Sequence, residues 1–313
     1  MTTSSVRNST LTITPVTDSF VAEARGLDLR EAQEPAILRE IANAMDRYAV
    51  LVFRGQQLSQ AEQLAFARQM GPPDTKLNAI MKFIQNRMDS PEISDISNVD
   101  ESGEVADKNH RQAMMNIGNR IWHTDSSFME TPWRYSMLYA VTAVSWGGQT
   151  QWADLRAAYD ALDDRMRELI DDLVAEHYAL QSRMILGYTD SSEAELKLFP
   201  PVRWPLVRTH AGSGRKLLFV SSSIREIIGM SLPAGRELAA ELLEHATQRE
   251  FVHSHQWAPG DFVMWDNRSV LHRGRRFDET ERREMRRVAT VDDVPALPID
   301  EDSRTKIFGQ PAI

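Results

Sequence analysis

The chain has 313 residues, of which 42% are hydrophobic, with a formal net charge of -9 and no cysteine. This length and apolar content suffice for a large buried core, and we expect residues 1–313 to form a single domain. The negative charge argues against nucleic acid or an anionic membrane as the main partner, and the lack of cysteine excludes disulfides, thiolate nucleophiles and iron–sulfur clusters. Any metal must be held by His, Asp and Glu, which suit Fe(II), Mn(II) or Zn(II).

The N-terminal part of the chain predicts alternating short strands and helices. Its first ten residues are polar, and no segment resembles a signal peptide or membrane span, so we expect a cytoplasmic protein. Residues 11–14 alternate like a strand, 35–48 carry apolar residues at helical spacing, and 49–53 are continuously apolar like a buried strand. Ser59 and Glu62 match a capping box, which opens a helix that ends at residues 71–72.

The segment from about residue 74 to 120 is rich in Met, Asn, Asp and Gly and keeps no period. Because it precedes a candidate metal motif, we interpret it as an active-site lid, with a disordered surface loop as the alternative. Residues 135–154 return to strand composition around a bend at 147–148. Residues 155–180 place apolar side chains on one stripe, which predicts a helical insert.

The second half of the chain predicts mostly strands. Residues 207–220 have the pattern of a hairpin turning at 212–214, and 233–248 that of a helix. Residues 251–291 predict three strands, separated by turns at 259–261 and 266–267 and by an acidic turn. A tail from about 293 to 313 completes the chain.

The most informative motif is His123-Thr124-Asp125, which places an imidazole and a carboxylate two residues apart. On an extended strand end, these two side chains point to the same side. One further histidine completes a triad of two histidines and a carboxylate, which leaves one side of an iron ion open. His272 is the candidate, because a strand, a tight Asp266–Asn267 turn and a second strand deliver it beside the start of the first.

Other histidines fit a metal role less well. His253 and His255 share one strand face, but they have no carboxylate at ligand spacing. His177 and His245 fall within predicted amphipathic helices, where surface or helix-end roles are the better interpretation. From its hairpin, His210 either lines a pocket or lies at the surface.

A basic strand follows the third candidate ligand. Residues 273–287 contain seven arginines and four acidic residues. If residues 282–287 form a strand, one face carries Arg283, Met285 and Arg287, and the opposite face carries Arg282, Glu284 and Arg286. We expect the second set to be the solvated face of an edge strand. The first set supplies two inward guanidiniums, 11 and 15 residues after His272, on a strand able to run beside the one that bears His272. Buried guanidiniums are costly unless paired, so they indicate anionic small molecules as partners.

These motifs resemble the taurine/2,4-dichlorophenoxyacetate family of Fe(II)- and 2-oxoglutarate-dependent dioxygenases. The resemblance runs from about residue 11 to 292. Several segments in the right order look like the 2,4-dichlorophenoxyacetate branch: residues 50–55, 122–128, 134–138, 208–216, 242–251 and 264–276. The resemblance implies a mixed α+β fold with a mainly β core, a double-stranded β-helix (jelly roll) with flanking helices and an active-site lid.

The resemblance also implies roles for individual residues. His123, Asp125 and His272 would ligate Fe(II) and carry catalysis. Thr150, 27 residues after the first ligand, and Arg283 match the anchors of the distal carboxylate of 2-oxoglutarate. Three further positions match contacts to the primary substrate: Arg287 for its acidic group, and Asn119 and His210 for the pocket around it.

The implied activity is hydroxylation of a small carboxylate with O2, while 2-oxoglutarate yields succinate and CO2. An aryloxyalkanoate substrate would then break at its ether to a phenol and an oxo acid; a sulfonate, an alkyl sulfate or a natural aromatic acid is the alternative substrate. Residues 221–229 lack histidines expected in the branch, and residues 74–89 match poorly, so Lys76 and Lys82 are both candidates for a substrate-contacting lysine. We also expect a homo-oligomer.

Overall fold

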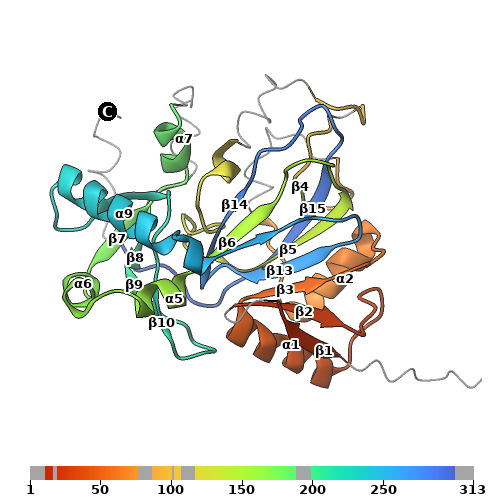
Figure 1. Ribbon diagram of the computed structural model, residues 1–313, viewed down its shortest axis with the longest axis horizontal. Helices are drawn as coiled ribbons and strands as arrows, with labels where there is room; N and C mark the ends of the chain where they lie inside the picture. Colours follow the sequence, from red (N-terminus) through yellow and green to blue (C-terminus); the bar gives the residue numbers. More distant parts are fainter. Residues whose placement is uncertain are drawn as a thin grey trace, which may run out of the picture.

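A computed structural model describes residues 11–16, 20–76, 87–100, 102–106, 117–187 and 199–299. These residues form a mixed α/β fold built on several antiparallel sheets (Figure 1). The prediction of a mixed fold with a β core and flanking helices is therefore confirmed. Within the same ranges, no helix combines the length and apolar character needed to cross a membrane.

The largest sheet has seven strands in the order β1-β2-β3-β13-β5-β15-β4. Its strands are β1 (Thr12–Pro15), β2 (Val21–Arg25), β3 (Val50–Phe53), β4 (Ile93–Asp95), β5 (Trp133–Thr142), β13 (Phe262–Asp266) and β15 (Glu284–Val291). Among the described strands, β2 and β3 alone pair in parallel. Strand β13 lies between β3 and β5, so segments from both ends of the chain share the centre of the sheet.

Three smaller sheets complete the strands of the described residues. One has the order β12-β6-β14 and another β11-β7-β8, and β9 pairs with β10. Their bounds are β6 (Thr150–Asp154), β7 (Val174–His177), β8 (Val202–Pro205), β9 (Val207–Thr209), β10 (Lys216–Leu218), β11 (Ile224–Ile227), β12 (Val252–His255) and β14 (Val270–Gly274). The hairpin predicted for residues 207–220 is confirmed as β9 and β10.

The described part of the chain contains the helices α1 (Pro35–Tyr48), α2 (Gln60–Met70), α5 (Leu155–Asp160), α6 (Asp164–Ile170), α7 (Gln181–Ile185) and α9 (Leu232–Ala246). It also contains the 3-10 turns η1 (Ile117–Arg120) and η2 (Arg249–Phe251). Helix α1 has the predicted bounds, and α9 lies within two residues of its prediction. The capping box before α2 is also confirmed: Ser59 Oγ accepts from Glu62 N, and the Glu62 carboxylate accepts from Ser59 N.

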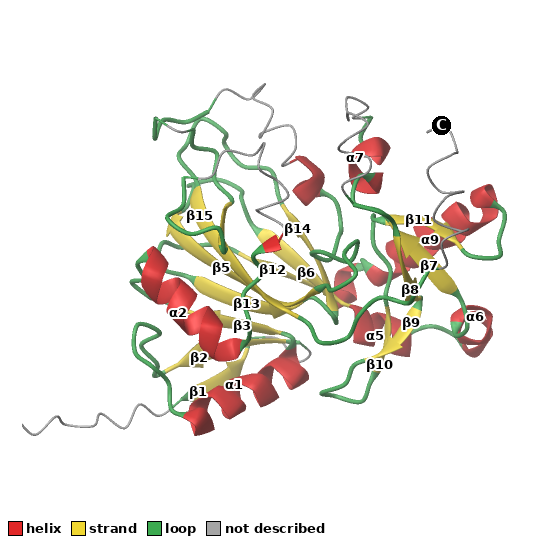
Figure 2. Ribbon diagram, turned by 180° about the vertical axis from the view of Figure 1, so that it is seen from behind, coloured by secondary structure: helices red, strands yellow, loops and turns green. Residues whose placement is uncertain are grey.

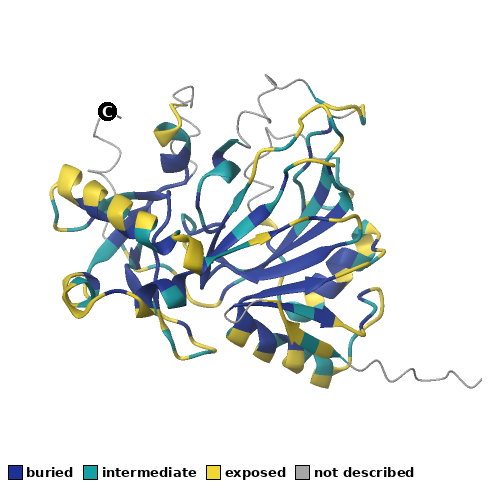
Figure 3. Cartoon of the chain, in the orientation of Figure 1, coloured by how far each residue is buried: buried dark blue, intermediate teal, exposed yellow. Residues whose placement is uncertain are grey.

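Two faces of the large sheet are covered by different layers. Because neighbouring strand residues point to opposite faces, Met264 and Trp265 of β13 enter two separate cores. Met264 packs with residues of α1 and α2, whereas Trp265 lies 5.7 Å from Trp152 of the β12-β6-β14 sheet. Figure 2 shows α1 and α2 on one side of this architecture, and in Figure 3 the strands between the layers are buried while the helices expose one side.

The helical insert predicted for residues 155–180 is wrong in its second half. Helix α5 ends at Asp160, and Asp163 caps α6 by accepting from Met166 N. Residues 174–177 then form β7, between β8 and β11. The strands that stabilise β7 lie at least 25 residues further along the chain, so a local apolar stripe could not predict it. His177 is therefore a buried strand residue and not part of a helix.

The prediction for residues 251–291 also needs correction. The region has four strands and not three, and β14 pairs with β6, so the Asp266–Asn267 turn carries the chain from one sheet to the other instead of closing a hairpin. Strand β15 lies between β5 and β4 rather than at an edge or beside β14. Its predicted solvated face is partly covered, because α2 packs there and Gln63 donates to Arg286 O.

Part of the predicted lid is structured. Strand β4 pairs with β15, and the next residues continue along it, where Ile96 N bonds to Met285 O and Asn98 N to Arg283 O. Residues 77–86, 101 and 107–116 of this segment lie outside the described residues, so the lid stays a prediction. The predicted tail beyond residue 299 lies outside them as well.

Candidate metal centre and active-site pocket

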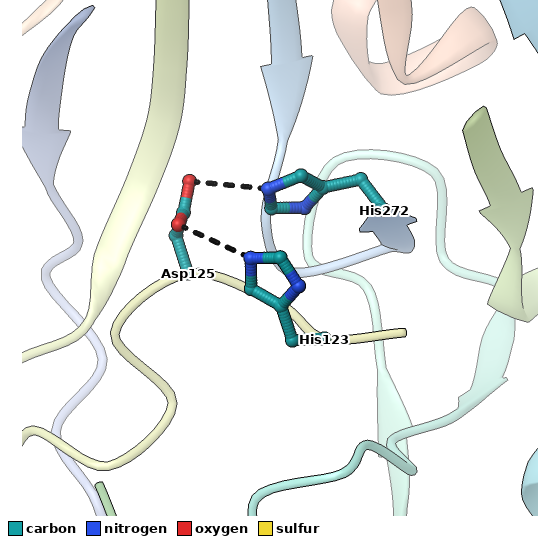
Figure 4. A group of neighbouring side chains, drawn as sticks. All are labelled: His123, Asp125 and His272. Carbon is teal, nitrogen blue, oxygen red and sulfur yellow. Dashed lines mark ion pairs between the residues drawn. The ribbon is translucent and has the colours of Figure 1, made fainter. Parts of the chain in front are cut away.

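His123, Asp125 and His272 come together as a triad, the name used below for these three residues (Figure 4). Their ligand atoms lie within 4.8 Å of one another. The Nε2 atoms of His123 and His272 are 3.9 and 3.6 Å from the two oxygens of Asp125. Both separations are longer than a hydrogen bond, as expected when the groups converge on a shared ion rather than on each other.

Backbone pairing places these side chains. His123 and His272 face each other across an isolated antiparallel bridge, with N–O distances of 3.0 and 2.7 Å between their backbones. The chain turns directly after Asp125, where Ser126 has φ 55° and its Oγ accepts from Trp133 N. The predicted extended geometry thus holds at His123, and Asp125 begins a turn that aims its carboxylate back at the two rings.

The protonation state of the histidines suits metal binding. His123 Nδ1 lies 2.8 Å from Ile121 O, and because a carbonyl only accepts, Nδ1 carries the proton and Nε2 keeps its lone pair. Burial lowers the pKa of the His123 imidazole and that of the His272 imidazole, the latter to about 3. Both imidazoles are therefore neutral near pH 7, as ligation requires.

Asp125 supplies the negative charge of the triad. Burial alone would raise its pKa, but the Arg287 guanidinium and the two histidines outweigh burial and lower the pKa to about 2. Arg287 Nη1 donates to Asp125 Oδ1 at 3.0 Å, and Ser136 Oγ donates to the other oxygen at 2.7 Å. A carboxylate with two neutral imidazoles is a donor set that fits Fe(II) and leaves coordination positions open.

The triad opens onto a pocket of about 490 Å³. Four residues predicted to bind cosubstrate or substrate line it: Asn119, Thr150, Arg283 and Arg287. Apolar side chains line it too, among them Ile96, Val99, Ile117, Leu138, Trp265 and Phe277. An anionic small molecule with an apolar body matches this mixture of arginine and hydrophobic wall.

Arg283 is a half-buried cation without an ion pair to any described acid. Its Nη1 donates to Ile96 O, and its guanidinium lies over the Phe277 ring. Burial, with a contribution from Arg120, lowers the pKa of Arg283 to about 10. Such a group lacks a counter-ion, and a ligand carboxylate would supply one.

Thr150 begins β6 after the predicted bend, in which Gly147 and Gly148 have φ of 76° and 69°. A Cβ on Gly147 would lie 2.1 Å from Arg276 O, so only glycine fits there. The Thr150 hydroxyl accepts from Trp257 Nε1 at 2.9 Å. This bond occupies an oxygen lone pair and leaves the hydroxyl proton free to donate into the pocket.

His210 does not join the pocket. Its Nε2 lies 3.0 Å from Asp266 Oδ2, and its Nδ1 accepts from Ser213 N within its own turn. These bonds aim the ring at Asp266, and His210 is not among the residues that line the pocket, so its contact with the substrate stays a prediction. Arg268 also donates to Asp266. We call Asp46, His210, Asp266 and Arg268 the Arg268 cluster.

The histidine pair of β12 lies apart from the triad. His255 bonds to Asp261, which pairs with Arg54, and among the described residues neither His253 nor His255 belongs to a group at metal-ligand spacing. The predicted lysine contact is not located: Lys76 is exposed, and Lys82 lies outside the described residues.

Two features of this pocket were not predicted from the sequence. One is the bond by which Trp257 orients Thr150, which joins residues 107 positions apart. The other is the wall formed by residues 96–100, which depends on pairing with β15. No local signal could have found either one, because both arise from segments that are distant in the chain and adjacent in space.

The fold and this site define a metalloenzyme that binds small anions, and comparison with known proteins specifies it. The family described as taurine catabolism dioxygenase TauD, TfdA family matches residues 12–289, and the chain belongs to this family. It is an α-ketoglutarate-dependent dioxygenase.

Individual relatives agree with this family. The chain is 52% identical over 281 residues to an α-ketoglutarate-dependent 2,4-dichlorophenoxyacetate dioxygenase of Cupriavidus pinatubonensis, covering 89% of this chain and 97% of that one. It is 34% identical to an (S)-phenoxypropionate/α-ketoglutarate dioxygenase of Sphingobium herbicidovorans, covering 87% and 92%. The crystal structure of AAD-2 with Mn(II) and N-oxalylglycine superposes with a TM-score of 0.88 at 42% identity, covering 92% and 100%.

Proposed function

We propose that this enzyme uses Fe(II), 2-oxoglutarate and O2 to hydroxylate an aryloxyalkanoate such as 2,4-dichlorophenoxyacetate. The observation that carries the proposal is a half-buried Arg283, without an ion pair among the described residues, in the same pocket as His123 and His272. It is supported by the 52% identical relative, which is named for this substrate. The apolar part of the pocket suits an aromatic ring.

The roles of the residues follow from their contacts. The triad would hold Fe(II) through two neutral imidazoles and one ionised carboxylate. Arg283 and the Thr150 hydroxyl would hold the distal carboxylate of 2-oxoglutarate, with Trp257 fixing the hydroxyl. Arg287 keeps Asp125 ionised, and Arg287 and Asn119 would face the primary substrate.

When bound, Fe(II) and 2-oxoglutarate supply the oxidising chemistry, with succinate and CO2 as products. The residues of this chain contribute binding and orientation: they align the carbon next to the ether oxygen and shield it from water. Hydroxylation at this carbon produces a hemiacetal, which collapses to a phenol and an oxo acid. The protein need not supply a proton donor for that collapse, because hemiacetals of phenols break down in water.

The test is a substrate panel with iron-loaded enzyme, in which succinate, phenol and O2 consumption are measured. We expect 2,4-dichlorophenoxyacetate to give equal amounts of succinate and phenol. The second candidate has the same chemistry on a sulfonate, an alkyl sulfate or a natural aromatic acid. Succinate release with those compounds and none with any aryloxyalkanoate would refute the proposed substrate class while keeping the chemistry.

We also propose the finer features of the architecture that the family suggests. The two facing sheets that share Trp152 and Trp265 would form a double-stranded β-helix, with residues 74–120 as its lid. Proteolysis with and without ligand tests the lid, because closure should protect it. Sedimentation analysis tests the expected homo-oligomer.

A further inference from the structure

Behind the two histidine ligands lies an arginine to which the proposed function assigns no role. Arg273 directly follows His272 on β14, and its guanidinium lies over the Trp122 ring, with 4.3 Å between Cζ and the ring centroid. Trp122 in turn directly precedes His123. Because side chains alternate along extended backbone, Trp122 and Arg273 point away from the pocket that the two histidines face. Neither is among the described residues that line this pocket.

The segment that carries His123 has little backbone pairing of its own. Its pairing with β14 is the isolated bridge between His123 and His272, whereas β14 and β6 pair along their full length. Two further bonds join the segment to neighbouring loops, from Ser222 N to Trp122 O and from Thr124 Oγ1 to a backbone carbonyl. The contact between Trp122 and β14 therefore adds a side-chain link to a single backbone bridge.

Arg273 also contacts the strand that begins at Thr150. Its Nε donates to Gln151 Oε1 at 2.9 Å, and Gln151 is its register partner in the ladder of β6 and β14. This bond holds the guanidinium in one orientation over the Trp122 ring. One side chain thus joins three segments, each of which carries a metal ligand or the proposed anchor of 2-oxoglutarate.

The surroundings of Trp122 make this contact effective. The Trp122 ring is buried in an apolar core, and Arg273 is half-buried. A cation over an aromatic face is attracted by the ring quadrupole, most strongly over an indole, and the attraction grows as water is excluded. Arg273 and Trp122 are each one residue from a ligand, so movement of either one changes the separation of the two imidazoles.

We propose that Arg273 is a positioning residue for the metal centre and sets the spacing of His123 and His272 by holding Trp122 against β14. The inference rests on the proposed function, because it takes the triad to bind a divalent metal. Groups that orient metal-bound histidines typically contribute about 10- to 100-fold to metal affinity. Arg273 contributes in this way from the face of the bridge opposite the metal.

Metal binding by the metal-free protein tests the inference without turnover. Co(II) is the probe, because its visible absorption reports both the dissociation constant and the geometry of the ligands. We expect Arg273→Gln to weaken Co(II) binding about tenfold, equivalent to about 1.4 kcal/mol, and to change the absorption band at saturating Co(II). Arg273→Lys should keep part of the affinity, since an ammonium group also binds an indole face.

A double-mutant cycle identifies the contact responsible. Trp122→Leu should weaken Co(II) binding as Arg273→Gln does, and combining the two should add little, because both remove the same interaction. Arg276→Gln, which removes an exposed arginine further along the chain, is the matched control and should bind Co(II) normally. If Arg273→Gln does not fold, Arg273→Lys and Trp122→Phe carry the same measurement.

Urea unfolding of the metal-free proteins separates positioning from a structural role. A less stable Arg273→Gln protein with an unchanged Co(II) spectrum at saturation would overturn the inference, as would fully additive losses in the cycle. The proposed function fails by a different result: a wild-type protein that binds no Co(II), or binds it equally well after Asp125→Ala, would show that the triad is not the metal centre.

Discussion

Two clusters among the described residues bring His and Asp side chains to metal-ligand spacing, and they differ in what surrounds them. In both the triad and the Arg268 cluster, the ligand atoms lie within 4.8 Å of one another. The two histidines of the triad line a pocket, and their ring nitrogens lie 3.6 and 3.9 Å from the carboxylate oxygens of Asp125. In the Arg268 cluster, Arg268 donates to both oxygens of Asp266, at 2.9 and 2.6 Å, and His210 bonds to one of them.

The difference shows that ligand spacing alone does not define a metal site. An arginine already supplies the positive charge in the Arg268 cluster, so an ion there would have to displace it. In the triad, the carboxylate keeps an orientation toward two neutral nitrogens that carry free lone pairs. Unsatisfied groups beside a cavity therefore distinguish a binding site from a structural ion pair.

The largest expected effect comes from Asp125→Ala. We expect turnover to fall below detection and iron content to fall with it, since the variant loses the only carboxylate of the triad and leaves Arg287 unpaired. Metal analysis and succinate release measure both. Asp160→Ala, which removes an exposed carboxylate from α5, is the control and should keep full activity. Normal turnover in Asp125→Ala would mean that the triad is not the metal centre.

Asp266→Asn tests whether the Arg268 cluster is a structural ion pair and not a metal site. It leaves the buried Arg268 with only the longer ion pair to Asp46, at 3.8 Å, and we expect a loss of about 3–5 kcal/mol in the free energy of unfolding. Burial pushes the pKa of Asp266 up, but Arg268 and His210 lower it well below its usual range, so this carboxylate is ionised in the fold. Urea unfolding measures the loss, and iron content should not change. A variant that lost iron but kept its stability would reverse the assignment of the two clusters.

Arg283→Gln should raise the KM for 2-oxoglutarate about a hundredfold, since a buried charge-assisted pair contributes about 2–5 kcal/mol. Unlike Asp266→Asn, it should not lower stability, because Arg283 has no carboxylate partner in the described structure. Steady-state kinetics with each substrate varied in turn checks the first point, and thermal unfolding the second. A raised KM for the aryloxyalkanoate, with that for 2-oxoglutarate unchanged, would contradict the role of Arg283.

The smallest effect concerns pH and His177, a buried histidine on β7 whose two ring nitrogens have no partner among the described residues. Burial lowers its pKa from 6.5 to about 3. Between these values the unfolded chain binds a proton and the native protein does not, so stability is full above pH 6.5 and falls as pH falls toward 3. At pH 5 the loss from this group is about 2 kcal/mol, at 1.36 kcal/mol per pH unit.

His177→Phe should remove this part of the acid sensitivity. The difference in free energy of unfolding between pH 7 and pH 5, measured in urea for both proteins, should shrink by that amount. His245→Phe provides the control, because His245 lies on α9 and its ring bonds to Ala158 O. If the difference in free energy of unfolding between pH 7 and pH 5 shrank equally in both variants, the burial of His177 would not be the cause of the acid sensitivity.

Much of this protein was predictable from local sequence. Helix α1, the capping box before α2, the β9–β10 hairpin and the Gly147–Gly148 bend each depend on residues a few positions apart, and all were predicted. The two-residue spacing of His123 and Asp125 also has a local cause, since it follows from backbone geometry. Their partner His272 was predicted from a strand–turn–strand pattern, and Arg283 and Arg287 from the alternation of a basic strand. The resemblance added their roles, and the structure brings His272, Arg283 and Arg287 to one pocket.

What the sequence by itself determined is the set of chemical groups and their local elements: neutral nitrogens, one carboxylate and a run of arginines, without cysteine. The tertiary structure decided which of these groups meet and which charges stay unpaired. In the folded protein, residues 174–177 form a strand, β15 lies in the interior of the sheet, and His210 bonds to Asp266. Arg283 forms no ion pair with any acid among the described residues. The physical reason is that strand pairing and charge compensation join residues distant in the chain, and no local period records their approach.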